Sequence, residues 1–126
     1  MSNYAFGTAI TCIDGRVQMP VTDWIRANFH VDYVDAITEP GADKLVSTAT
    51  PDELESIRNK VMISIRAHKS KLVAVIGHHD CAGNPVSNEE HLEMIRKAVE
   101  VVSSWELSVT VIGLWVNEHW QVSQVN

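Results

Sequence analysis

The sequence predicts an α/β fold, a layered sandwich whose mainly parallel four-stranded sheet has the order 2-1-3-4, with a C-terminal hairpin strand and helices on both faces. Apolar, β-rich runs alternate with amphipathic segments along the chain, as in parallel strands joined by right-handed helical crossovers. No repeat, low-complexity tract or linker interrupts this pattern. The 126 residues, 45% of them hydrophobic, suit one compact core. We therefore expect a single domain over residues 1–126.

The N-terminal segment predicts a strand followed by a short helix. Residues 4–11, YAFGTAIT, form an apolar and β-rich run that ends at Cys12, and the DGR after it is a turn signal. The segment DWIRANF, residues 23–29, predicts a short helix with Thr22 as its N-cap and Asp23 in its first turn. We therefore expect the cysteine at the carboxyl end of a strand.

The middle of the chain predicts a second strand and the clearest helix. Residues 31–38, VDYVDAIT, predict the strand, and residues 39–44, EPGADK, predict a turn after it. Residues 50–70 predict the helix, because Thr50 is a good cap and Glu53 completes a capping box. Its apolar residues follow at steps of three and four and predict a stripe that packs on the sheet: Leu54, Ile57, Val61 and Ile65.

The C-terminal half predicts a third strand, another helix and a hairpin. Residues 71–77, KLVAVIG, are typical of a buried strand. Ser87 and Glu90 form a second capping box for a helix over residues 88–105. The buried face of this helix is predicted to contain Leu92, Ile95, Val99 and Val102. Residues 107–125 are apolar, then polar, then alternating, which predicts a fourth strand and a hairpin return.

Three side chains with soft or borderline metal-ligand atoms follow two of these strands. Cys12 comes after the first strand, and His78 and Cys81 come after the third. In the order 2-1-3-4 the first and third strands are neighbours, and their carboxyl ends flank one crevice. Two thiolates and one imidazole match the set that leaves zinc a fourth, exchangeable position. The sequence therefore predicts a zinc site, although either cysteine taken alone is more simply a buried small hydrophobe.

Composition excludes several classes of partner. The net charge is −6, with 10 Lys and Arg against 16 Asp and Glu, and no basic run suggests nucleic acid or anionic membrane as a partner. The N-terminus lacks the features of a signal peptide, and no apolar run approaches a membrane span. We therefore expect a cytoplasmic protein, and in a reducing compartment two distant cysteines are more often metal-binding or catalytic than disulfide-bonded.

Two short motifs carry a family resemblance. CIDGR, residues 12–16, resembles the Cys-x-Asp-x-Arg motif of the β-class carbonic anhydrases, and HHDC, residues 78–81, resembles their His-x-x-Cys motif. Both stand in the family's order at predicted strand ends, and the resemblance extends over nearly the whole chain. The sequence is thus similar to a short, divergent member of that family.

The resemblance implies an activity, a cofactor and an assembly. The activity is reversible hydration of carbon dioxide to bicarbonate by zinc-bound hydroxide, with Zn²⁺ as cofactor and a homodimer or higher homo-oligomer as the assembly. Carried over by position, the zinc ligands are Cys12, His78 and Cys81, and the catalytic dyad is Asp14 and Arg16. Asp14 is also a candidate zinc ligand, since its carboxylate can take the fourth position in place of water.

The sequence departs from the family pattern in one informative segment. Residues 35–43, DAITEPGAD, stand where the family usually has an Arg-Asn-Ala-Gly-type segment, and Ala82 replaces a usual glycine, with Gly83 following. The departure leaves open a zinc hydrolase of another small linear molecule, such as carbonyl sulfide or carbon disulfide. A non-catalytic zinc-binding or thiol-switch module is a further alternative. A nucleotide-binding module is disfavoured because no glycine-rich loop follows the first strand.

The remaining histidines and tryptophans are expected to have mainly structural roles. His79 and Asp80 are candidates for proton transfer, but solvent exposure or hydrogen bonding to the ligands is the preferred interpretation. The histidines expected outside the site are His30, His68, His91 and His119, of which His68 and His91 are predicted to be exposed or half-buried on helices. Trp24 and Trp105 are predicted to pack on helices. Trp115 and Trp120 are predicted to form sheet or dimer surface.

Overall fold

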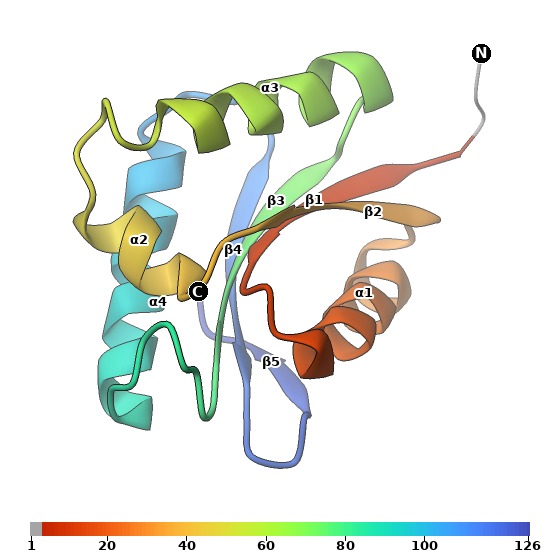
Figure 1. Ribbon diagram of the computed structural model, residues 1–126. Coiled ribbons are helices and arrows are strands. Elements are labelled where there is room, and N and C mark those ends of the chain that lie inside the picture. Colours follow the sequence, from red (N-terminus) through yellow and green to blue (C-terminus); the bar gives the residue numbers. More distant parts are fainter. Residues whose placement is uncertain (1–3) are drawn as a thin grey trace.

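The computed structural model describes residues 4–126, which form one sheet covered by helices on both faces (Figure 1). Residues 1–3, part of the segment in which we expected no signal peptide, lie outside the described residues. The strands are β1 (Phe6–Thr11), β2 (Tyr33–Thr38), β3 (Leu72–His78), β4 (Thr110–Val116) and β5 (Val122–Gln124). The helices are α1 (Gly15–Phe29), α2 (Ala42–Thr48), α3 (Glu55–His68) and α4 (Asn88–Ser103).

The strand order confirms the predicted sheet. The order is β2-β1-β3-β4-β5, with the first four strands parallel and β5 antiparallel to β4. Every residue of β3 is buried, because this strand lies between β1 and β4 and both of its faces are covered. The carboxyl ends of β1 and β3 therefore lie side by side at one edge of the sheet.

Two apolar clusters fill the space between the sheet and its helices. One lies under α1 and takes Leu72, Ala74 and Ile76 from β3, whereas the other lies under α2, α3 and α4 and takes Val73 and Val75. Alternate residues of one strand thus point into opposite layers. This arrangement gives the predicted sandwich with helices on both faces.

Helix α1 begins earlier than predicted. We expected Thr22 to be the N-cap, but the cap is Asp14, whose Oδ1 accepts the backbone N–H of Arg16 at 2.8 Å. Pro20 lies inside the helix and removes one backbone donor. The helix still forms across it because residues four apart on both sides pack into the core: Val17, Val21 and Ile25. Burial of this stripe outweighs the local penalty of the proline.

Helix α2 was not predicted. Residues 39–44 were expected to form only a turn, but the turn is confined to Pro40 and Gly41, and α2 starts at Ala42. The helix has only seven residues, too few to show a helical period in the sequence. Its stability comes from burial of Ala42 and Val46 against the sheet. The consequence for the site is that α2 brings one buried aspartate, Asp43, towards β3.

Helices α3 and α4 confirm the two predicted capping boxes in different degrees. Ser87 and Glu90 form the complete box at the start of α4. Thr50 and Glu53 also exchange their hydrogen bonds, at 2.9 and 3.3 Å, but residues 51–54 form a turn and α3 begins at Glu55. The predicted stripe on this segment is buried at Leu54, Ile57 and Val61 and half-buried at Ile65.

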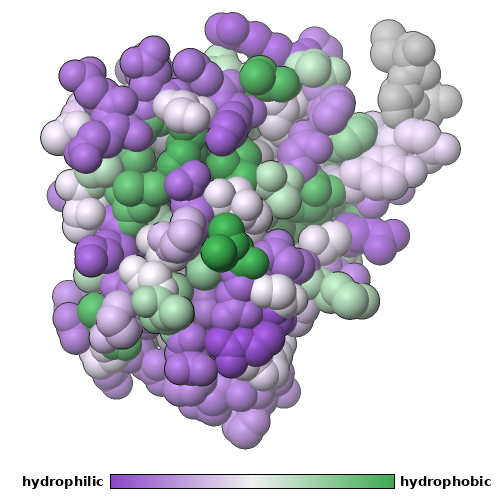
Figure 2. All heavy atoms as spheres, in the orientation of Figure 1, coloured by the Kyte–Doolittle hydropathy of each residue, from purple (hydrophilic) through white to green (hydrophobic). Residues whose placement is uncertain are grey.

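The surface is mostly hydrophilic on the face seen in Figure 2, where hydrophobic side chains gather near the centre, below α3. The exposed large hydrophobic residues of the described chain include Ile63 on α3, Met19 on α1 and Ile13, which follows Cys12 in the sequence. Within residues 4–126, no helix is both long enough and apolar enough to cross a bilayer.

Candidate metal centre

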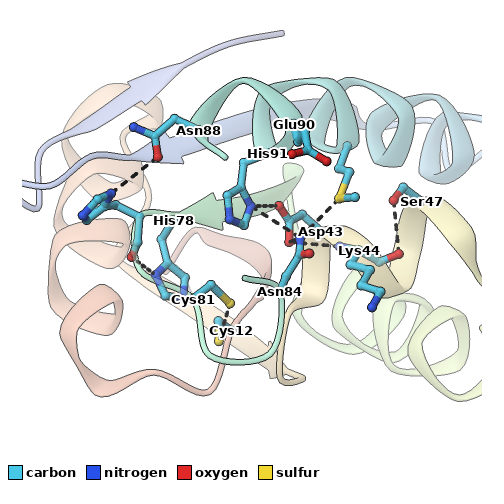
Figure 3. Close-up of polar contacts among 12 residues, drawn as sticks. Cys12, Asp43, Lys44, Ser47, His78, Cys81, Asn84, Asn88, Glu90 and His91 are labelled. Carbon is cyan, nitrogen blue, oxygen red and sulfur yellow. Dashed lines mark hydrogen bonds and ion pairs between the residues drawn. The ribbon is translucent and has the colours of Figure 1, made fainter. Parts of the chain in front are cut away.

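Cys12, His78 and Cys81 meet at the carboxyl ends of β1 and β3. One ligand atom from each residue lies within 4.8 Å of the other two, and all three residues are buried. Among residues 4–126 this is the one group of three or more His, Cys, Asp or Glu side chains arranged to hold a metal ion. The side chains that the hydrophobic pattern placed at two neighbouring strand ends are therefore together (Figure 3).

The ring of His78 is oriented for metal binding. Its Nδ1 lies 2.7 Å from the backbone oxygen of His79, so Nδ1 carries the hydrogen and donates it to that carbonyl. Its Nε2 is then the lone-pair nitrogen, and it is buried without a hydrogen-bond partner among the described residues. An unpartnered buried nitrogen is unfavourable by about 1 to 3 kcal/mol. A metal ion at Nε2 would remove this penalty, and the second nitrogen bonded to a carbonyl is the usual arrangement of a ligating histidine.

The two cysteines lie close together as free thiols. The Sγ atoms of Cys12 and Cys81 are 3.9 Å apart, and no disulfide joins them. The pKa of Cys81 is raised from 9.0 to about 11, mainly by burial and then by the nearby Cys12. Hydrogen bonds from the backbone amides of Gly83 and Asn84 act against this shift. A bound cation would favour both thiolates, because it supplies the positive charge that the surrounding side chains lack.

Asp14 and Arg16, which follow Cys12 closely in the sequence, form a bidentate ion pair. Nη2 of Arg16 lies 2.7 Å from Oδ2 of Asp14, and Nε lies 3.1 Å from Oδ1. The side-chain hydrogen bond from Arg16 lowers the pKa of Asp14 from 3.8 to about 2, and the carboxylate raises the pKa of Arg16 in turn. Because the folded-state pKa of Asp14 is lowered, the pair is fully formed above pH 4 and is lost only as the pH falls through about 2.

Arg16 is held by contacts with two further residues, Asp80 and Trp120. Its Nη1 lies 3.2 Å from Oδ2 of Asp80, and its Nη2 donates to the backbone oxygen of Asp80 at 3.1 Å. The guanidinium also lies over the ring of Trp120, 4.5 Å from its centroid. Trp120, which we predicted to form sheet or dimer surface, is half-buried and covers Arg16 within the same chain. Asp80 is exposed and connects the loop between His78 and Cys81 to α1.

Asp14 lies outside the group of three ligand atoms. Its carboxylate is directed to Arg16, and the metal-type group consists of Cys12, His78 and Cys81 alone among the described residues. The structure thus shows the arrangement in which Arg16 holds the aspartate. His79 is half-buried, and its Nδ1 lies 3.4 Å from Oδ1 of Asn88 on α4.

Sequence reasoning missed a buried polar group behind the ligands. His91 was predicted to be exposed or half-buried, and this prediction is wrong: the residue is 1% exposed and its Nδ1 lies 2.6 Å from Oδ2 of Asp43. The sequence did contain an indication that His91 is buried, because His91 stands four residues before Ile95 and so lies on the same, buried face of α4. Trp115 was predicted to form sheet or dimer surface and is instead buried, with its ring centroid 5.4 Å from that of His91.

The other expected structural residues lie where predicted. Trp24 packs partly buried on the cluster under α1, and Trp105 does so on the cluster under α3 and α4. The remaining histidines are exposed, namely His30, His68 and His119. None of these three belongs to the metal-type group.

The described residues resemble solved carbonic anhydrases. The carbonic anhydrase from Streptococcus mutans superposes with a TM-score of 0.64 at 16% identity, covering 94% of this chain and 81% of that one. The β-carbonic anhydrase isoform I from Trichomonas vaginalis gives a TM-score of 0.64 at 15% identity, with 99% and 86% covered. The carbonic anhydrase from Glaciozyma antarctica gives 0.61 at 16% identity, with 94% and 81% covered. The chain therefore has the fold of the β-carbonic anhydrases.

The sequence itself matches one family model. The model is described as "Putative carbonic anhydrase" and matches residues 2–126, so the chain belongs to this family. The membership confirms the resemblance carried by the CIDGR and HHDC motifs. No curated protein sequence gives a significant match.

Proposed function

We propose that this protein is a zinc-dependent lyase that hydrates carbon dioxide reversibly to bicarbonate. The observation that carries the proposal is the buried group of Cys12, His78 and Cys81, with its unpartnered Nε2, in a chain of the carbonic anhydrase family. The donor set fits zinc, since two thiolates and an imidazole with no fourth protein ligand are typical of catalytic sites.

The three ligands would hold Zn²⁺ at the edge of the sheet. When bound, zinc lowers the pKa of water and so supplies a nucleophile near neutral pH. Carbon dioxide is small and linear, so its carbon needs only an unobstructed approach to that nucleophile. The same requirement holds for carbonyl sulfide and carbon disulfide, which are therefore the substrates to test next.

Asp14 and Arg16 would orient the reacting water. Asp14 is ionised at every physiological pH, and its carboxylate accepts hydrogen bonds only, so it can fix the direction of one O–H bond. Arg16 keeps that carboxylate in place through the bidentate ion pair. Asp80 and Trp120 in turn hold the guanidinium of Arg16. Fixed hydrogen-bonding groups of this kind lower an activation barrier because they need no reorganisation during the reaction.

Metal content and hydration rate, measured together, test the proposal. The purified protein should contain one zinc per chain and hydrate carbon dioxide in a stopped-flow assay. Cys81→Ser should lose the metal. Arg16→Ala should retain zinc and lose most activity, because Asp14 is released, whereas Arg26→Ala, which changes an exposed arginine on the same helix, should behave as wild type.

Two results would contradict the proposal, and a third would contradict the role of Asp14 and Arg16 in it. A wild-type protein without zinc would leave a thiol-based role for Cys12 and Cys81. A zinc protein that is inactive with carbon dioxide at every pH would move the assignment to the sulfur-containing substrates or to a binding role. Wild-type rates in Arg16→Ala with zinc retained would reduce the pair with Asp14 to a helix cap. The homodimer and the cytoplasmic location stay predictions.

A further inference from the structure

Three buried polar side chains from three separate elements meet directly behind the metal-type group. Asp43 comes from α2, Asn84 from the loop after Cys81, and His91 from α4 (Figure 3). Their exposed fractions are 1%, 0% and 1%. Buried polar side chains persist when they are paired, and each pairing fixes the elements that carry the two partners.

The carboxylate of Asp43 is the centre of this group. Its Oδ1 accepts the backbone N–H of Lys44 at 2.9 Å and Nδ2 of Asn84 at 3.1 Å, and its Oδ2 lies 2.6 Å from Nδ1 of His91. A carboxylate already surrounded by donors is an acceptor, so Nδ1 of His91 carries the hydrogen in this bond. Because an unpaired buried carboxylate is strongly unfavourable, α2, α4 and the loop are held to one another.

The same carboxylate lies against the backbone just before His78. A Cβ atom at Gly77 would lie 2.6 Å from Oδ2 of Asp43, closer than any side chain allows. Asn84, at the other end of the segment, also donates its backbone N–H to the oxygen of Cys81 at 3.2 Å. Asp43 therefore fixes both ends of the segment that carries two of the three metal-type ligands.

The loops that follow β2 and β3 are in direct backbone contact. A Cβ at Gly41 would lie 2.7 Å from the oxygen of Gly83, and a Cβ at Gly83 would lie 2.6 Å from the nitrogen of Gly41. The amides of Gly83 and Asn84 in turn hydrogen-bond to Cys81. The loop before α2 therefore lies directly against the backbone that donates to the thiol of Cys81.

We propose that Asp43, Asn84 and His91 are positioning residues that hold the segment from Gly77 to Asn84 in the geometry required for metal binding. The inference rests on the proposed zinc site and extends it. It also gives a role to residues 35–43, the segment that departs from the usual family sequence, because this segment supplies the carboxylate. Loss of such supporting bonds typically lowers metal affinity by about 10- to 100-fold.

The primary test compares two matched carboxylates. Asp43→Asn keeps the side-chain volume and removes the charge, and Asp35→Asn makes the same change in the half-exposed aspartate that pairs with His68. Zinc affinity is measured by competition with a chromophoric chelator at a temperature at which both variants are folded. We expect Asp43→Asn to bind zinc about 10- to 100-fold more weakly and Asp35→Asn to bind as wild type.

A spectroscopic readout separates positioning from general stability. Cobalt(II) in place of zinc gives visible bands that report ligand geometry, so Asp43→Asn should shift these bands and Asp35→Asn should not.

Variants of the two partners of Asp43 give an independent test. His91→Phe should show the same loss of zinc affinity, and His91→Gln, whose amide can donate to Asp43, should recover part of it. Asn84→Ala removes only one of the three donors to Asp43, disturbs folding least, and should also weaken zinc binding.

The outcomes distinguish this inference from the proposed function. Wild-type affinity and an unchanged cobalt spectrum in folded Asp43→Asn, or wild-type affinity in Asn84→Ala, would overturn the positioning role even if thermal stability falls. A wild-type protein that binds no zinc would overturn it as well. Tight zinc binding that depends on Asp43, in a protein that is inactive with carbon dioxide, would support the inference and contradict only the proposed activity.

Discussion

Two aspartate–histidine pairs within residues 4–126 have almost the same length and very different surroundings. Oδ2 of Asp43 lies 2.6 Å from Nδ1 of His91, and Oδ2 of Asp35 lies 2.7 Å from Nδ1 of His68. The side chains of the first pair are 2% and 1% exposed, whereas those of the second are 27% and 45% exposed. Distance alone would rank the pairs as equal. Burial separates them, because only in the first pair does the loss of one partner leave the other without water.

The residues around the two pairs also indicate that the buried pair depends more strongly on both of its partners. Asp35 also accepts a hydrogen bond from Ser64 at 2.7 Å, and the ring of His68 stacks on Phe6 at a centroid distance of 4.2 Å. Solvent can replace either partner there. Asp43 instead faces Asn84 and the backbone of Gly77, where a missing partner leaves an unpaired charge.

The largest expected effect is on folding stability when each histidine is removed. His91→Ala should lower the free energy of unfolding by about 3 to 5 kcal/mol, because it removes the donor to Oδ2 of a carboxylate that water does not reach. His68→Ala should lower it by about 1 kcal/mol or less. Urea denaturation of the metal-free proteins measures both values. Equal losses in the two variants would show that burial does not separate the pairs.

A smaller effect is expected at the helices that carry the two histidines. Ser87→Ala removes the cap of α4, which carries His91, and should lower the free energy of unfolding by about 1 kcal/mol. Thr50→Ala removes the similar cap before α3, which carries His68, and should have less effect because a turn separates this cap from the helix. Urea denaturation again provides the measurement, and a larger loss in Thr50→Ala would contradict the comparison.

Salt should distinguish the two pairs by a few tenths of a kcal/mol. Exposed charges are screened at high ionic strength, whereas a pair without solvent access is screened much less. The destabilisation by His68→Ala should shrink when sodium chloride is raised from about 0.05 to about 1 M. The destabilisation by His91→Ala should stay constant. A salt-sensitive His91→Ala would indicate that water reaches Asp43.

The smallest effect is expected on the pKa of Glu53, a fully exposed carboxylate. The backbone N–H of Thr50, and then its hydroxyl, lower the pKa of Glu53 below its ordinary value of 4.5. Because the folded-state pKa is the lower one, this contribution to stability is present above the ordinary pKa and is lost as the pH falls through the lowered value. NMR titration of the Glu53 carboxyl should show the lowered pKa. A normal pKa of Glu53 in the folded protein would contradict the capping bonds.

The sheet and the meeting of Cys12, His78 and Cys81 were predictable because they depend on local hydrophobic pattern and on one rule of sheet topology. The apolar run of β3 and the capping box of α4 are visible in the sequence, and the strand order then brings Cys12 next to His78 and Cys81. The partners of the buried polar group were not predictable in the same way. His91 is buried as a polar residue only because Asp43 reaches it from a helix too short to show a period.

Helix α1 shows a second limit of local pattern. The turn signal at residues 14–16 and the predicted N-cap at Thr22 together place the start of the helix too late. The observed start depends on Asp14 acting at once as the N-cap and as the partner of the Arg16 side chain. Both of these bonds join residues two apart, and Arg16 is held in addition by Asp80, which lies 64 residues away and outside any local window of sequence.

The backbone contact between Gly41 and Gly83 restricts how this protein can evolve. Neither position can acquire a side chain while the other loop stays in place, and Gly41 also has a φ of 61°, which disfavours other residues. A substitution or insertion in one loop therefore requires a compensating change in the other. Among related sequences, these two positions should change together or not at all, and residues 40–43 should be inherited with the segment around Cys81 as one unit.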